Sequence, residues 1–243
     1  MPIFIKGFNA LRMKRIYLSI VFLFLIVGTA EAQMFDIGLK GAFNTTWLFN
    51  QKYGGDQPFD YDFTFGTSVG AGGTFCFGGK SYYSHPTLSY GFEVRYSTIN
   101  QGYMALYDTM PIPYISKVHL NFIEIPLIIK GRTPSGLYGE IGPQFSSLIS
   151  ATADSSNSNP SSQAHTNVRG EYSTGNISLL LGIGFEADLS STMIIMFGLR
   201  TTIGFTDMTY PEHGNGDYNP TNSFTAGFHI GISYKMDFFH DNH

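Results

Sequence analysis

The 243-residue chain has little charge, because 14 Lys and Arg and 18 Asp and Glu make up only 13% of it, about half the usual share. Its formal net charge of −4 leaves no basic excess to neutralise phosphates, which argues against general nucleic-acid binding. The single cysteine, Cys76, excludes an internal disulfide and a cysteine-rich zinc site. In contrast, 22 Phe, 15 Tyr and 28 Gly are present, and many aromatic residues at low net charge argue against disorder.

An apolar segment of about a dozen residues, 16–27, follows four basic residues and precedes Ala30-Glu31-Ala32. A basic region, a short apolar region and an A-x-A site in this order are typical of a secretory signal peptide. The apolar segment is short for a membrane anchor, because a spanning helix needs about 20 residues. We therefore expect residues 1–32 to be a cleaved signal peptide and residues 33–243 to form one domain, in which we expect no transmembrane helix.

After this segment, apolar residues recur at every second position, which is the period of a β-strand. In residues 88–97, for example, the even-numbered residues are apolar and the odd-numbered residues are polar or small. The pattern predicts eight strands, at residues 35–44, 65–77, 88–97, 123–130, 137–149, 177–186, 192–205 and 224–238.

Two architectures fit these strands. A soluble sandwich or lipocalin-like barrel turns its apolar side inward, whereas an outer-membrane barrel turns it to lipid. The polar side is rich in Gly, Ser and Thr, aromatic residues gather at strand ends, and strands of this length can cross a membrane at a tilt. We therefore predict an all-β fold, an eight-stranded antiparallel transmembrane β-barrel.

Almost every charge within the strands falls on the polar side of the alternation, which faces the lumen in such a barrel. The predicted lumenal charge network is Asp36, Lys40, Glu93, Arg95, Glu124, Lys130, Glu140, Glu186, Arg200 and Lys235. Because an eight-stranded interior is just wide enough for side chains to fill, we expect ion pairs rather than an ion path or a catalytic acid pair. We also expect a bulge or kink at Pro126, which removes a ladder donor.

The connections between the predicted strands alternate between long and short. The long ones are residues 45–63, 101–116, 150–173 and 207–222. Outer-membrane barrels have long external loops and short periplasmic turns, so we expect both termini in the periplasm. The first long loop has aromatic residues that could bind a protein or glycan, or could form a packed lid or an interfacial anchor: Trp47, Phe49, Tyr53, Phe59 and Tyr61.

Residues 121–130, NFIEIPLIIK, resemble the "Leu/Ile-Glu-Ile-Pro-Leu-Leu-x-Lys" strand of the PorT-like outer-membrane β-barrel proteins of Bacteroidetes. The glycine-rich segments 139–143, 181–186 and 198–200 are similar to the strands that follow in that family. The resemblance extends in order along the chain and implies an eight-stranded barrel in the outer membrane of a Gram-negative bacterium. One member of the family takes part in type IX secretion, but most have no assigned task, so the resemblance implies location more than activity.

The leading hypothesis is a non-enzymatic outer-membrane barrel with a filled polar lumen and a structural, adhesive or secretion-accessory role. We expect outer-membrane lipid and envelope or secretion-machinery proteins as partners, a monomeric state, and no cofactor or metal. One alternative is a small diffusion channel. Another is a lipid-modifying enzyme that uses His119, which lies near the external rim; we expect no nucleophile elbow for it.

Overall fold

A computed structural model describes residues 34–49, 60–62, 64–77, 87–105, 114–156, 164–209 and 221–237. The predicted signal peptide and the loop residues Tyr53 and Phe59 lie outside these ranges. Within the ranges, no helix has the length and apolar character needed to cross a membrane.

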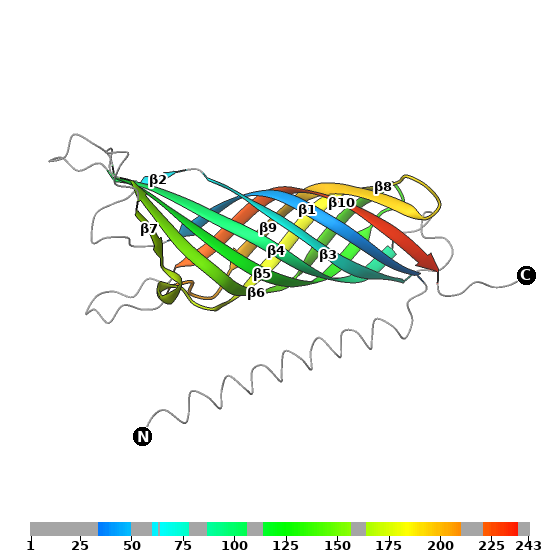
Figure 1. The fold of residues 1–243 in the computed structure, drawn as a ribbon. Coiled ribbons are helices and arrows are strands. Elements are labelled where there is room, and N and C mark those ends of the chain that lie inside the picture. The colour runs from blue at the N-terminus through cyan, green and yellow to red at the C-terminus, as the bar shows by residue number, and fades with distance from the viewer. Residues whose placement is uncertain are drawn as a thin grey trace, which may run out of the picture.

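Eight long strands close into an antiparallel barrel (Figure 1). They are β1 (Met34–Phe49), β3 (Phe65–Phe77), β4 (Thr87–Ala105), β5 (Tyr114–Arg132), β6 (Leu137–Ser156), β8 (Gly175–Asp188), β9 (Met193–Gly204) and β10 (Asn222–Asp237). Each pairs with the next long strand, and β10 pairs with β1, which confirms the predicted eight-stranded barrel. Closure leaves no free edge among the long strands, as a lipid environment requires.

The two ends of the barrel differ. Met34 pairs with Asp237, so the first and last strands meet at the end that also has the turns at 133–136 and 189–192; we call it the terminal end. At the other end β4, β5 and β6 continue further, and two short strands, β2 (Asp60–Asp62) and β7 (Ala164–Asn167), pair with β4 and β6. Figure 1 shows this extended end on the left.

Around its middle, the barrel has an apolar outer surface. Leu39 of β1 is 64% exposed and Ile183 of β8 63%, whereas Glu93, which faces inward from β4, is 2% exposed. On β4 the apolar outward residues extend over residues 88–96, close to the 9–11 residues that a tilted strand needs to cross hydrocarbon. An apolar surface that encircles the molecule is unfavourable in water, so lipid is the medium that this band fits.

The alternation reverses beyond this band. In the extended end the inward residues become apolar, as with Val118 and Leu120, and the outward residues become polar, as with Lys117 and Asn121. The resulting apolar core consists of Leu48, Ile99, Val118, Leu120, Phe122, Leu148, Ala151, Ala153, Val168, Tyr172 and Met208. The expectation of a polar lumen is therefore wrong for this half of the barrel, where the strands pass into water and pack as in a soluble protein.

Strand β6 has a bulge at the level where the lipid-facing band ends and the apolar core begins. Asn121 pairs with Ser150 but Phe122 pairs with Leu148, so Ile149 has no partner in β5. The expected bulge at Pro126 is wrong, because β5 keeps one register against β4 on both sides of this residue. The missing N–H of Pro126 instead leaves a short gap in the β4–β5 ladder.

The strands reach further into three predicted loops than expected. Trp47 and Phe49 belong to β1, and the Trp47 ring lies 5.6 Å from that of Phe224 in β10. Tyr61 belongs to β2, opposite Tyr103 of β4. Placing these three residues in one loop was therefore wrong, because inward apolar residues such as Leu48 and Ile99 extend the strands past the lipid-facing band.

Candidate functional site

The interior of the terminal half contains all ten residues of the predicted charge network, which come from seven of the eight long strands. They face inward because they occupy the polar positions of the alternation. Most are almost fully buried, and Lys40 is partly buried. An unpaired charge in such a place is costly, so their mutual contacts decide what this interior can do.

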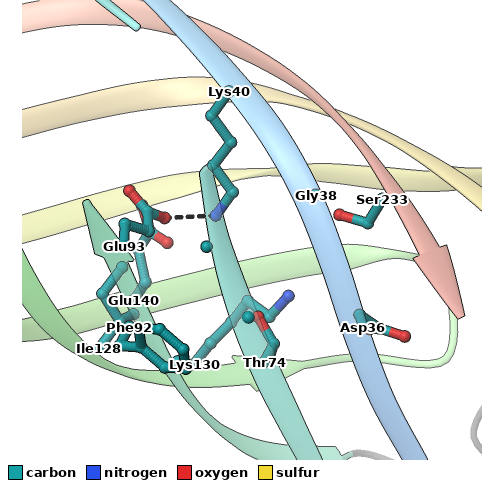
Figure 2. A pocket seen from close by; sticks show the side chains of 13 residues that line it. Asp36, Gly38, Lys40, Thr74, Phe92, Glu93, Ile128, Lys130, Glu140 and Ser233 are labelled. Carbon is teal, nitrogen blue, oxygen red and sulfur yellow. Dashed lines mark hydrogen bonds and ion pairs between the residues drawn. The ribbon is translucent and has the colours of Figure 1, made fainter. Parts of the chain in front are cut away.

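Arg200 in β9 occupies the centre of the network. Its two terminal nitrogens donate to both Glu93 oxygens, at 2.7 and 2.8 Å, and one also donates to Glu140 at 3.0 Å. Its Nε donates to the other oxygen of Glu140. Lys40 Nζ lies 2.5 Å from Glu93 Oε1, the contact drawn in Figure 2. These charge-assisted bonds connect β1, β4, β6 and β9 across the barrel.

Next to this centre, Arg95 of β4 donates to Glu124 of β5 at 3.0 Å and to the amide oxygen of Gln144 in β6 at 2.5 Å. Arg95 Nε also lies 4.0 Å from Glu93. Through Glu93, the two arginines belong to one continuous network rather than to separate pairs.

Nearer the terminal end, Glu186 accepts a bond from Lys130 at 2.5 Å and lies 3.3 Å from Arg132 Nε. Lys130 Nζ also lies 5.6 Å from the centre of the Tyr138 ring. The Tyr138 hydroxyl is bonded to Nε2 of the buried His229 at 2.6 Å. This group links β5, β6, β8 and β10.

Two contacts lie at the terminal rim. Lys235 donates to Asp188 at 2.6 Å, and the Cys76 thiol donates to Asp36 at 3.6 Å. Sequence reasoning missed Arg132 and Asp188, although both continue the inward period, two residues after Lys130 and Glu186. Among the described residues, the interior and its rim together have six basic and six acidic side chains, of which Asp188 is exposed at the rim: Lys40, Arg95, Lys130, Arg132, Arg200 and Lys235, with Asp36, Glu93, Glu124, Glu140, Glu186 and Asp188.

Small residues make room for these long side chains. A Cβ added at Gly182 would overlap the Glu140 carboxylate, and one at Gly231 would come within 2.9 Å of Lys40 Cγ. The cavity beside the central cluster, shown in Figure 2, has a volume of about 10 Å³. That is about the room that one water molecule needs, so side chains fill the space beside the central cluster.

On the outer face, His119 lies between two oxygens. Its Nδ1 is 2.8 Å from Asn100 Oδ1, and its Nε2 is 3.4 Å from Asp154 Oδ2. Residues 66–70, Gly-Thr-Ser-Val-Gly, do match the nucleophile-elbow pattern, against expectation. Ser68, however, is buried inside β3, and the chain continues as a strand after it as far as Phe77, so Ser68 does not lie on the strand-to-helix turn of that motif. Within the described ranges, no three His, Cys, Asp or Glu side chains gather as metal ligands.

Several solved structures are similar to the chain at low identity. Neisserial surface protein A matches at 12% identity over 83% of this chain and 97% of its own, with a TM-score of 0.40. Ail of Yersinia pestis matches at 11% over 85% and 99%, with a TM-score of 0.35. OprG of Pseudomonas aeruginosa matches at 12% over 85% and 98%, with a TM-score of 0.36.

Comparison with curated proteins finds no match. A family model does match, over residues 30–210, and its description is "Outer membrane protein beta-barrel domain". The match covers most of the chain and includes every strand of the barrel except β10, whose place is fixed by its pairing with β1 and β9. The chain therefore belongs to the outer membrane protein beta-barrel domain family.

Proposed function

We propose that this protein is a sealed, non-enzymatic outer-membrane barrel with a structural, adhesive or secretion-accessory role, acting through the surface of its extended end. The observation that carries the proposal is the filled interior. Ion pairs occupy the terminal half, and an apolar core closed by Tyr172 and Met208 occupies the extended half. A barrel that is closed in both halves acts through its outer surfaces rather than by conducting solutes.

Planar-bilayer recording tests the sealed interior. We expect the purified protein to give no steady single-channel steps, because the cavity beside the central cluster holds about one water molecule. A triple variant, K40A/E93A/R200A, removes the side chains at the centre and is the matched comparison. Steady steps from the unmodified barrel would contradict the proposal and favour a small diffusion channel.

We further propose that the terminal end faces the periplasm and the extended end faces the outside of the cell. The short turns at 133–136 and 189–192 support this orientation, because outer-membrane barrels place short turns in the periplasm. The polar outer surface and apolar core of the extended end are suited to water.

Two cysteine variants test the orientation, and the only native cysteine, Cys76, is buried. A membrane-impermeant maleimide added to intact cells is expected to label T166C, in the extended end. T133C, in a terminal turn, is expected to react only after the outer membrane is opened. The reverse labelling order would show that the orientation is inverted.

The finer assignment, to the PorT-like group of Bacteroidetes, is supported by the resemblance of residues 121–130. A secretion-accessory role predicts that deleting the gene changes the set of secreted proteins. A purely structural or adhesive role predicts an unchanged set together with altered envelope integrity or attachment. Comparing secreted proteins and attachment in the same deletion strain separates these roles.

The alternative of a lipid-modifying enzyme depends on His119. Both ring nitrogens of His119 already face oxygens of Asn100 and Asp154, which supports a structural role for the ring. We expect H119A to leave the lipid composition of expressing cells unchanged. A lipid alteration that appears with the unmodified protein and disappears with H119A would establish the enzyme instead.

A further inference from the structure

The outer face of the extended end has a compact set of hydroxyl, amide and imidazole side chains. We define the polar patch as Thr67, Thr98, Asn100, His119, Asn121 and Ser150. We infer that this patch binds the sugar-and-phosphate headgroup of an outer-leaflet glycolipid whose acyl chains lie on the apolar band beside it. The inference rests on the proposed outward orientation of the extended end.

The patch consists of two rows that cross neighbouring strands. In the first row, Thr67 of β3 and Thr98 of β4 have hydroxyls 3.4 Å apart, and Asn121 of β5 donates to Ser150 of β6 at 2.8 Å. Thr98 is paired with Asn121, which joins the two halves of this row. The first row is therefore one line of polar groups across four strands.

In the second row, Asn100 of β4 faces His119 of β5. Asn100 Nδ2 donates to the Phe65 carbonyl at 2.5 Å, so its Oδ1 is the atom turned toward His119 Nδ1. His119 therefore presents an N–H there, and its Nε2 lies beside Asp154. These contacts hold the row in one arrangement, which lowers the entropic cost of binding a ligand.

The patch begins where the lipid-facing band ends. The row before Thr67, Thr98 and Asn121 consists of the outward residues Val69, Tyr96 and Ile123. Residues two positions apart along a strand are separated by about 7 Å, so one amphipathic molecule can contact this apolar row and the first polar row together. This continuity favours a membrane glycolipid over a soluble protein as the occupant.

The chemistry of the patch favours a headgroup rich in hydroxyls. Thr and Ser hydroxyls both donate and accept hydrogen bonds, as sugar hydroxyls do. Lys117 is an exposed cation two residues from His119 on the same face, and Asp154 is its partner in the β5–β6 register. A site for phosphate alone would be expected to have a cluster of basic side chains, which the described part of this face does not have.

Binding to the purified full-length protein in detergent tests the inference. The probes are a bacterial lipid A that retains its core sugars, a phosphatidylglycerol of matched acyl length, and the free core oligosaccharide. We expect the glycolipid to bind at least tenfold more tightly than the phospholipid. The double variant T98V/N121L should bind it about 25-fold more weakly, at about fivefold for each lost hydrogen bond.

T166V is the matched control, because Thr166 is exposed in the extended end but outside the patch. Its glycolipid binding should equal that of the unmodified protein. Equal binding of glycolipid and phospholipid, or unchanged binding by T98V/N121L, would overturn the inference. So would full competition by the free oligosaccharide, which would identify a site for soluble glycans. Because the measurement uses neither conductance nor cell labelling, its failure is distinguishable from failure of the sealed-barrel proposal and from failure of the proposed orientation.

Discussion

Replacing Arg200 with Ala should destabilise the barrel more than any single change on its lipid-facing surface. Arg200 bonds both oxygens of Glu93 and both oxygens of Glu140. After truncation Glu93 keeps Lys40 at 2.5 Å, but in the described part of the chain Glu140 loses the basic side chain with which it forms an ion pair. Removing one partner of a buried ion pair costs about 3–5 kcal/mol.

That loss is a large share of the total stability, which is typically about 5–15 kcal/mol. With a urea dependence of about 1–3 kcal/mol per molar, the unfolding midpoint should fall by roughly 1–5 M. Urea titration in lipid vesicles, read by the heat-dependent gel mobility of folded barrels, measures the shift. L199A is the matched control, because Leu199 is adjacent in β9 but exposed to lipid; its cost should stay near or below 1 kcal/mol.

A second substitution separates charge from packing. R200M/E140Q replaces a charged pair by neutral groups of similar volume and should recover most of the loss, since neutral replacements of buried pairs are often tolerated. A cost below about 1 kcal/mol for R200A would refute the reasoning. It would mean that water solvates Glu93 and Glu140, and hence that the terminal half is not filled.

Three further changes probe other parts of the molecule. Y172A should loosen the apolar core of the extended end and speed proteolysis there, while the membrane-embedded barrel keeps its gel mobility; equal loss of both would contradict two separable halves. G182V should lower the yield of folded barrel, because the added atoms overlap the Glu140 carboxylate, whereas G139V on the open outer face should not. Cys76, 2% exposed, should react with maleimide only after unfolding, and rapid labelling of the folded protein would disprove its burial.

The membrane-embedded part of the fold could be predicted from the sequence because lipid imposes a strict period of two. The outward Leu39 is followed by the inward Lys40, and the inward Gly182 by the outward Ile183. Within the band this alternation continues without interruption. The same period predicted which charged residues share the interior. It did not predict their partners, because the contact of Arg200 with Glu93 depends on the curvature of the closed barrel.

The extended end could not be predicted in the same way. Past the band the two-residue period persists, but the apolar positions face inward instead of outward. From the sequence alone, Val118 and Leu120 would be assigned to the lipid-facing surface, whereas both belong to the apolar core. The bulge at Ile149 adds a change of phase within β6. Arg132 and Asp188 were missed for a simpler reason, since the predicted strands ended two residues too early.

The unpaired Ile149 also determines how this chain tolerates changes in its length. Deleting it would remove only the extra residue, because Ser150 already pairs with Asn121 on the outer side, so every later residue of β6 would keep its side. Deleting Thr152 instead would exchange the sides of the residues after it, so that Ala153 would face outward and Asp154 would enter the apolar core. A one-residue deletion at the bulge should thus be tolerated far better than one elsewhere in this part of β6, and we expect length variation among relatives to gather at this position.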